Sequence, residues 1–213
     1  MEILDVFDGN HVHLGTAERG EVHDRGLWHQ TFHCWVVNER DGKRNLVVQQ
    51  RSATASSNAG KLHVTGAGHL RAGEQPTEAG LRELAEEIGV VAHARDLVYL
   101  GVRHDVEDFP DGRENREFAH VYLLRDDRDL TRYRFTDGEV TALVEIELAA
   151  ALDLFTGQAS EVAGTEVRLL GGVMHTRRRV VTAEHFATRP DPYCATVTIM
   201  AQLLLDGATH LSI

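Results

Sequence analysis

The stretch that decides the fold is GHLRAGEQPTEAGLRELAEEIGV, residues 68–90, in which a glycine-containing turn leads into an amphipathic segment. Apolar side chains recur there at the three- and four-residue spacing of one helix face: Ala79, Leu81, Leu84, Ala85 and Ile88. Thr77 or Glu78 is expected to serve the free amides of the first turn, and Gly89 is expected to end the helix. The sequence therefore predicts a loop and a helix within residues 66–90.

Three glutamates share one face of this predicted helix. Glu83, Glu86 and Glu87 stand at positions i, i+3 and i+4, so their carboxylates project together and repel one another. A hard cation between the carboxylates would offset that repulsion. Mg²⁺ is such a cation, and it binds carboxylates together with substrate phosphate oxygens. Arg82 adjoins the cluster and could orient a carboxylate or bind a phosphate. The alternative interpretation is an ordinary solvated helix face.

The fixed positions of the stretch resemble the box that characterises the Nudix family. That pattern is a glycine, five residues, a glutamate, seven residues, and then Arg-Glu-apolar-any-Glu-Glu-any-Gly-apolar, and every fixed position is met here. The resemblance implies a metal-dependent hydrolase of diphosphate (acid anhydride) bonds, with Mg²⁺, or alternatively Mn²⁺, as cofactor. The roles that it implies are catalytic for Glu83, Glu87 and Arg82, metal-binding for Gly68, Glu83, Glu86 and Glu87, and structural for Glu74.

Later residues complete the expected site. Glu139, in the segment TDGEV at 136–140, resembles the further carboxylate that this family takes from a later loop, and is expected to act as a base or an extra ligand; an exposed turn acid is the alternative. Arg51 and Arg82 are expected to bind substrate. The basic run at residues 175–179 could also reach a substrate phosphate, or could be a solvated strand end.

Three longer segments resemble the Nudix subgroup that includes isopentenyl diphosphate isomerase. They are GEVHDRGLWHQTFHCWVV at 20–37, AGHLRAGE at 67–74 and ENREFAHVY at 114–122. That isomerase has a separate metal site made of histidines and glutamates. The resemblance implies a second metal site at the matching residues, which are His23, His29, His69 and Glu117, with Glu114 as a weaker match.

Departures from the isomerase favour a hydrolase. The isomerase has a catalytic cysteine directly before the glycine-histidine pair, whereas this chain has Ala67, which cannot exchange a proton. Ala55 and Ser56 stand where the isomerase has diphosphate-binding lysines. The predicted function is therefore hydrolysis of a diphosphate that links a nucleoside or another small organic group to a second moiety. An isomerase of the same kind and a non-catalytic, nucleotide-sensing Nudix domain remain the alternatives.

The remaining pattern predicts a mixed β-sheet flanked by helices, an α+β arrangement within the α/β class that matches the α/β/α sandwich of the Nudix fold. Short strands are expected around residues 2–7, 11–15, 31–37, 45–51, 62–66, 97–102, 118–124 and 140–144, with helices around 147–154 and 193–205. We expect a single domain over residues 1–213, with an N-terminal β extension at 1–28 and a C-terminal helical part at 147–213.

Composition limits the partners. A formal charge of −11 and a pI near 5.6 argue against binding of a nucleic-acid polymer, which needs clustered Lys and Arg. No apolar run is long enough to span a bilayer, and no signal peptide is evident, so we expect a cytoplasmic location, no membrane partner and a small-molecule diphosphate as substrate. The two cysteines are expected to be free thiols. The sequence leaves the oligomeric state open, with a homodimer as the commonest assembly.

Overall fold

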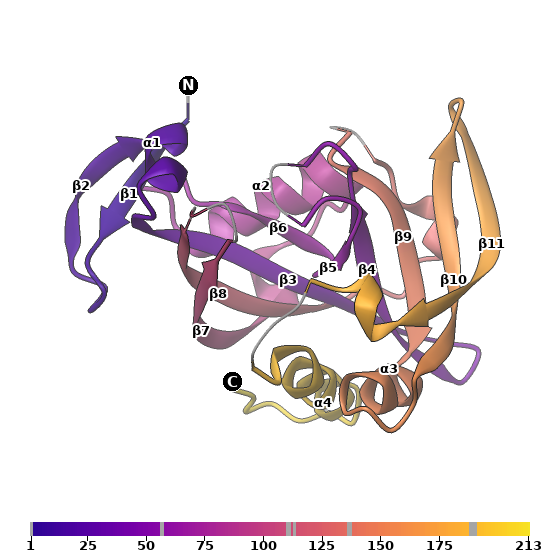
Figure 1. The fold of residues 1–213 in the computed structure, drawn as a ribbon. Coiled ribbons are helices and arrows are strands. Elements are labelled where there is room, and N and C mark those ends of the chain that lie inside the picture. Colours follow the sequence, from indigo (N-terminus) through magenta and orange to yellow (C-terminus); the bar gives the residue numbers. More distant parts are fainter. Residues whose placement is uncertain (1, 56–57, 110–111, 113, 136–137, 188–190) are drawn as a thin grey trace.

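The computed structural model describes residues 2–55, 58–109, 112, 114–135, 138–187 and 191–213. Its strands connect into one sheet with the order β11-β10-β9-β4-β3-β1-β2, to which β5, β6, β7 and β8 are joined through β4 and β3 (Figure 1). The strands are β1 Ile3–Phe7, β2 His13–Glu18, β3 Trp28–Arg40, β4 Lys43–Arg51, β5 Leu62–His63, β6 Gly66–His69, β7 Leu97–Asp108, β8 Glu114–Arg125, β9 Val140–Glu147, β10 Glu161–Leu170 and β11 Val173–Thr182. The helices are α1 Arg19–Asp24, α2 Pro76–Ile88, α3 Leu148–Phe155 and α4 Tyr193–Leu205, with short 3₁₀ turns at Ala94–Asp96, Leu130–Arg132 and Ala183–His185.

Strand β3 organises the sheet. It pairs antiparallel with β4 and β6 and parallel with β8, in a register that sets His29 opposite Glu117. β7 pairs antiparallel with β8 over its whole length. Because parallel and antiparallel pairs meet at one strand, the sheet is mixed, and the predicted α+β class is confirmed. The strands expected at 31–37 and 45–51 are confirmed as parts of β3 and β4, which pair as an antiparallel hairpin.

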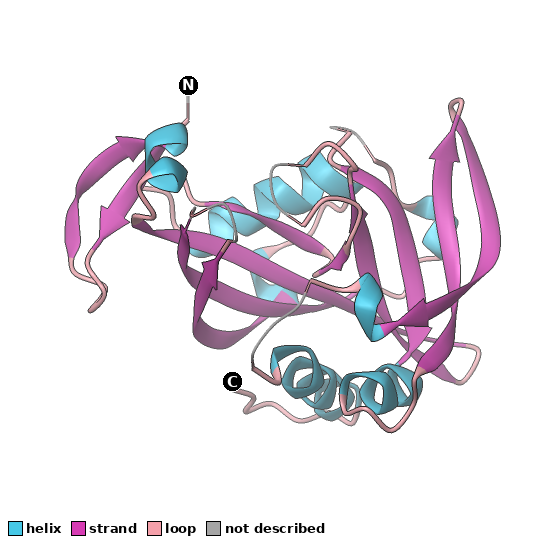
Figure 2. Cartoon of the chain, viewed as in Figure 1, coloured by secondary structure: helices cyan, strands magenta, loops and turns pink. Residues whose placement is uncertain are grey.

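Helices cover both faces of the sheet, which gives the expected three layers (Figure 2). Alternate side chains of β3 supply two separate cores. Trp35 and Val37 pack with α3 and α4 on one face, whereas Phe32, Cys34 and Val36 pack with α2 on the other. The two-residue period of a strand explains this division, since both faces of β3 carry apolar side chains.

Helix α2 begins and ends for identifiable reasons. Pro76 occupies its first turn, where the missing N–H costs nothing, and Gly89 ends it with φ of 67° in the left-handed region. The expectation that Thr77 or Glu78 would cap the helix is wrong. The cap position is Gln75, which makes no side-chain cap hydrogen bond, because the helix already begins at Pro76.

The C-terminal part differs from its prediction. Residues 147–213 contain helices α3 and α4 as expected, but also the long hairpin of β10 and β11, paired from Glu161↔Thr182 to Leu170↔Val173. The expectation of a helical segment missed these two strands, because Glu166 and the arginines of EVAGTEVRLL and VMHTRRRVVT interrupt the apolar alternation that marks a strand. The short helix α1 was also not predicted.

No helix in the described ranges has the length and apolarity that a membrane-spanning helix requires. The two cysteines are both free: Cys34 is fully buried and Cys194 is half-buried, as expected. Burial raises the pKa of the Cys34 thiol, so this side chain behaves as a small core residue.

Candidate active site

The residues of the helical stretch line a polar cavity of about 760 Å³. Its wall is built by the end of β6, by α2 and by the segments that flank them. Arg82, Glu83 and Glu86 enter the cavity from α2, and Gly68 enters it from β6. The remaining lining residues are Glu2, Ile3, Arg19, Arg51, Ala67, His69, Arg71, Ala72 and Glu139. We refer to this space as the box cavity. The structure thus brings Glu139 and Arg51 to the same cavity as the helix carboxylates.

Arg82 holds this site together. Its Nε and Nη2 atoms each donate to one oxygen of Glu74, both at 2.9 Å, while Nη1 donates to Glu83 at 2.5 Å and to Glu86 at 3.3 Å. A further bond from Nη2 reaches the carbonyl of His69 in β6. One guanidinium therefore fixes two cavity carboxylates and ties the helix to the strand, and Glu74 serves as its anchor.

Gly68 lies against the carboxylate of Glu83. A Cβ atom at residue 68 would be 2.1 Å from Cδ of Glu83, so only glycine allows this approach. Burial raises the pKa of Glu83 to about 7, against the opposing charge of Arg82. Without a bound cation, the carboxyl group of Glu83 is therefore only partly ionised at neutral pH.

Glu87 occupies a different position from the other two box glutamates. It is 2% exposed, and its Oε2 accepts hydrogen bonds from the amide of Ala67 at 3.1 Å and from Gln49 at 3.4 Å. It is not among the residues that line the box cavity. Glu87 therefore fixes the backbone of β6, directly behind the site.

The donor set of the box cavity fits a hard divalent cation. Glu83 and Glu86 bring two carboxylates to a wall where glycine leaves space for a close approach, and Arg82 compensates only part of their charge. Oxygen ligands of this kind suit Mg²⁺ or Mn²⁺. Thr136 and Asp137, which precede Glu139 in its loop, and Ser56 in the loop after β4, lie outside the described residues.

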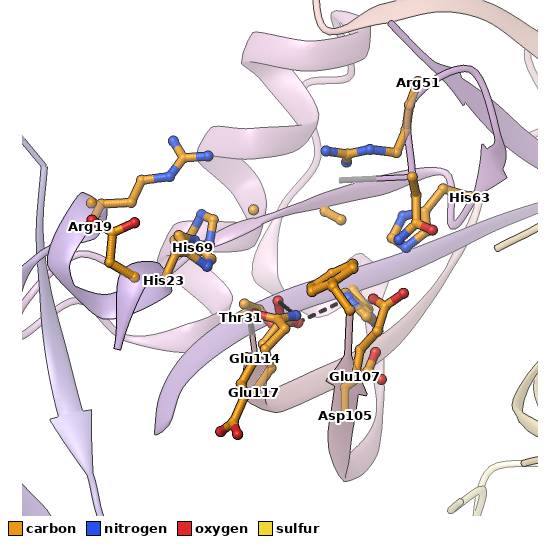
Figure 3. Close-up of a pocket in the computed structure, with 18 residues that line it drawn as sticks. Arg19, His23, Thr31, Arg51, His63, His69, Asp105, Glu107, Glu114 and Glu117 are labelled. Atoms are coloured by element: carbon orange, nitrogen blue, oxygen red, sulfur yellow. Dashed lines mark hydrogen bonds and ion pairs between the residues drawn. The ribbon is translucent and has the colours of Figure 1, made fainter. Parts of the chain in front are cut away.

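A second cavity, of about 270 Å³, adjoins the first and contains most of the expected histidines (Figure 3). Arg19, Arg51, Ala67, Gly68 and His69 line both cavities. Here His23, His29 and His69 form a cluster whose ring nitrogens lie within 4.8 Å of one another, and Nε2 of His23 is 3.0 Å from Nε2 of His69. Burial lowers the pKa of His23 and, more strongly, of His69, so both rings are held neutral.

Glu117 lies beside the histidine cluster, as expected, whereas Glu114 does not join it. Oε1 of Glu117 is 3.9 Å from Nε2 of His29. Glu114 lines the cavity wall, but its carboxylate pairs with Arg116 at 3.0 Å and is half-exposed. The structure therefore assembles His23, His29, His69 and Glu117 from α1, β3, β6 and β8.

Sequence analysis overlooked a second set of side chains in this cavity. His33, Asp105 and Glu117 also offer ligand atoms within 4.8 Å of one another. A signal for them exists, because His29, Thr31 and His33 alternate along β3 and therefore share one face of the strand. The same period relates Asp105 to Glu107 on β7.

The basic run expected at residues 175–179 lies away from the two cavities. In the basic run, Arg177 and Arg179 lie on β11 and bind the buried Glu166 at 2.8 Å, and the run contributes no residue to either cavity lining. Trp35 and Tyr193 pack together in the core, where Nε1 of Trp35 donates to the tyrosine hydroxyl at 3.0 Å.

Comparison with known proteins agrees with this arrangement. A family profile described as NUDIX domain matches residues 27–163. An uncharacterized Nudix hydrolase of Clostridium acetobutylicum is 38% identical over 148 residues, which cover 69% of this chain and 70% of that protein. Isopentenyl-diphosphate Delta-isomerase 2 of Photorhabdus laumondii is 30% identical over 128 residues, which cover 60% of this chain and 69% of the isomerase.

Solved structures show the same fold. A protein of Deinococcus radiodurans aligns with a TM-score of 0.56 at 20% identity, covering 73% of this chain and 90% of its own. A NUDIX hydrolase of Alicyclobacillus acidocaldarius aligns with a TM-score of 0.55 at 14% identity, covering 86% and 96%. The mixed sheet, its flanking helices and the glutamate-bearing helix α2 together define the Nudix fold. The chain belongs to the Nudix hydrolase family.

Proposed function

We propose that this protein hydrolyses a diphosphate linkage in a small organic molecule, with Mg²⁺ or Mn²⁺ bound in the box cavity. The observation that carries the proposal is the grouping of Glu83, Glu86 and Glu139 with Arg51 around one open polar space. Arg82 is part of the same wall and keeps two of these carboxylates in place. Substrates of this class include nucleotide sugars, dinucleotides and other nucleoside diphosphate derivatives.

Each residue around the box cavity has its own proposed role. Glu83 and Glu86 would hold the cation together with the carbonyl of Gly68, and Glu87 supports that strand from behind. When bound, the cation neutralises phosphate charge and activates water. Arg51 binds a phosphate oxygen, Glu139 accepts the proton of the attacking water, and Arg82 keeps the helix carboxylates oriented.

A second candidate function follows from the histidine cluster. Nε2 of His29 is buried and has no hydrogen-bond partner within the described residues, and it faces Glu117. We propose that His23, His29, His69 and Glu117 bind one divalent metal ion. The set resembles that of the isomerase, but Ala67 provides no proton-transfer group beside it. Hydrolysis is therefore preferred over double-bond migration, and over a sensor that binds without turnover.

The test is turnover by the purified protein with Mg²⁺ or Mn²⁺ on nucleotides, nucleotide sugars, dinucleotides and isopentenyl diphosphate. We expect cleavage of at least one diphosphate, reduced by roughly 100-fold or more in Glu83→Gln because a cation ligand is lost. Glu78→Gln, on the same helix but outside the lining of the box cavity, is the matched control and should retain activity. Tight binding without cleavage would instead support the sensor, and migration of the double bond would support the isomerase.

A further inference from the structure

Glu117 stands between two groups of histidines. Its Oε1 is 3.9 Å from Nε2 of His29, and its Oε2 is 4.0 Å from Nε2 of His33. Each oxygen also accepts one hydrogen bond, from Asn115 to Oε1 at 2.7 Å and from Thr31 to Oε2 at 3.0 Å. The two neighbours fix the plane of the carboxylate, and a carboxylate oxygen that accepts one bond can still bind a cation.

The second group is itself a set of potential ligands from three strands. His33 comes from β3, Asp105 from β7 and Glu117 from β8, and their donor atoms lie within 4.8 Å of one another. His33 is 3% exposed and Asp105 is 7% exposed, so water reaches neither of them freely. Two buried carboxylates close together are costly unless positive charge accompanies them, and Arg103 beside Asp105 supplies one such charge.

Neighbouring groups orient these ligands. Nδ1 of His33 lies 3.2 Å from the hydroxyl of Tyr193, which leaves Nε2 as the nitrogen that faces the carboxylates. Nη1 of Arg103 holds Asp105 at 2.6 Å, and its guanidinium stacks over the ring of Tyr193. An outer layer that fixes ligand orientation is typical of metal sites.

The charge in the surrounding cavity also favours a cation. Asp105, Glu107 and Glu117 rise from β7 and β8 on one side of the space, with Arg51 and His63 on the other (Figure 3). Nε2 of His29, buried and without a hydrogen-bond partner in the described part of the chain, lies 3.9 Å from Oε1 of Glu117, on the side of the cluster of His23, His29 and His69.

We propose that His33, Asp105 and Glu117 bind a divalent transition-metal ion, and that Glu117 shares its carboxylate between this ion and the one in the cluster of His23, His29 and His69. One imidazole with two carboxylates suits Mn²⁺, Co²⁺ or Zn²⁺. This cation position is separate from the box cavity, although Ala67, Gly68 and His69 line both spaces. The sharing of Glu117 rests on the metal ion proposed above for His23, His29 and His69, but neither ion depends on the proposed hydrolysis.

Co²⁺ titration of the metal-free protein tests the proposal. The parent protein carries Glu83→Gln and Glu86→Gln, which remove the carboxylate ligands of the box cavity. Bound cobalt is counted by elemental analysis after dialysis, and its visible absorption reports nitrogen ligation. We expect two bound ions per chain in the parent, and one ion after Asp105→Asn or after His33→Asn, with an affinity loss of at least about 10-fold for the second ion.

His63→Asn is the matched control, because its ring lies 5.7 Å from that of His33 in the same cavity but belongs to neither ligand group. This variant should still bind two ions. Thermal melting of each metal-free variant establishes whether it folds. If one of the variants Asp105→Asn and His33→Asn does not fold, the other is used. Electron paramagnetic resonance adds a separate readout, since two cobalt ions that share Glu117 should be magnetically coupled.

The proposal is overturned if Asp105→Asn and His33→Asn bind as much cobalt as the parent, or if His63→Asn loses an ion as they do. No substrate is present in this experiment. A failure of diphosphate hydrolysis therefore leaves the result unchanged, and a missing second ion leaves the proposed hydrolysis standing.

Discussion

Contacts at Gly68 show how closely single residues are fitted in the box cavity. The glycine has no side chain, and Glu83 occupies the space where a Cβ would be. The carboxylate is in turn bound by Arg82, which Glu74 anchors through two bonds. A change at any of these residues should therefore act on the position of Glu83.

Gly68→Ala should lower kcat by roughly 100-fold, because a displacement of about 1 Å at a catalytic group has an effect of that size. The added methyl group would lie 2.1 Å from Cδ of Glu83 and must move that carboxylate. Gly9→Ala is the control, since its methyl group would make only an ordinary contact at 3.7 Å with Trp28. The measurement is steady-state kinetics on a cleaved substrate, and equal kcat in wild type and Gly68→Ala would contradict the assignment of Glu83.

At the scale of elements, helix α2 is positioned by close contact with strand β3. Gly80 faces the ring of Phe32, and a Cβ at residue 80 would be 2.0 Å from Cε2 of that ring. The same helix presents Leu84 and Ile88 to the core shared with the sheet. The distance between α2 and β3, and hence the depth of the box cavity, depends on this pair of residues.

Gly80→Ala should destabilise the protein by about 1–3 kcal/mol through overpacking, although alanine alone favours a helix by about 1 kcal/mol over glycine. The measurement is urea unfolding followed by circular dichroism. Adding Phe32→Leu should recover part of the lost stability, because the smaller side chain makes room for the methyl group. A Gly80→Ala protein more stable than wild type would show that the helix has moved away from β3 without penalty.

The sequence predicted elements best where the determinants are local. Helix α2 and its end at Gly89 follow from a dense motif and a left-handed residue; the end was located correctly, whereas the helix begins earlier than the expected cap at Thr77 or Glu78. The hairpin of β10 and β11 was not predicted, because Glu166 and its arginines interrupt the apolar alternation that marks a strand. Those charges are accommodated by bonds across the hairpin, which a one-dimensional pattern does not show.

The residues of the candidate site also fall into two groups, those that local sequence predicts and those that it does not. The carboxylates of α2 follow from helix spacing alone, whereas His33 and Asp105 meet only because β3, β8 and β7 lie side by side. β3 and β8 pair in parallel. Because no tight turn connects the two strands, the sequence does not indicate the register in which they pair. The position of Glu87 was also not predictable, since its burial depends on the contact of α2 with β6.

At the scale of the whole molecule, buried histidines make the fold sensitive to acid. His120 is 8% exposed, and its Nε2 has no hydrogen-bond partner among the described residues. Burial, together with the nearby His11, lowers its pKa to about 4. The unfolded chain therefore binds a proton near pH 6.5 that the folded protein accepts only near pH 4.

The contribution of His120 to the free energy of unfolding should be constant above pH 6.5 and should fall by on the order of 3 kcal/mol as the pH decreases from 6.5 to 4, whereas the raised pKa of Glu83 acts in the opposite direction. Urea unfolding at pH 4.5, 5.5 and 7.5 measures this dependence. The free energy of unfolding of His120→Gln relative to that of wild type should increase as the pH decreases from 6.5 to 4, whereas that of His175→Gln, at an exposed residue of β11, should not change. Parallel curves for wild type and His120→Gln would exclude His120 as a source of acid sensitivity.

The pairing of β3 with β8 also determines when during synthesis the histidine cavity can exist. Thr31 and Glu117, which hydrogen-bond to each other, are separated by 86 positions in the chain. A ribosome must therefore add all the intervening residues before the carboxylate reaches its neighbours. The histidines of β3 leave the ribosome before Asp105 and Glu117, so imidazoles are available to a metal ion earlier than the carboxylates of the proposed site.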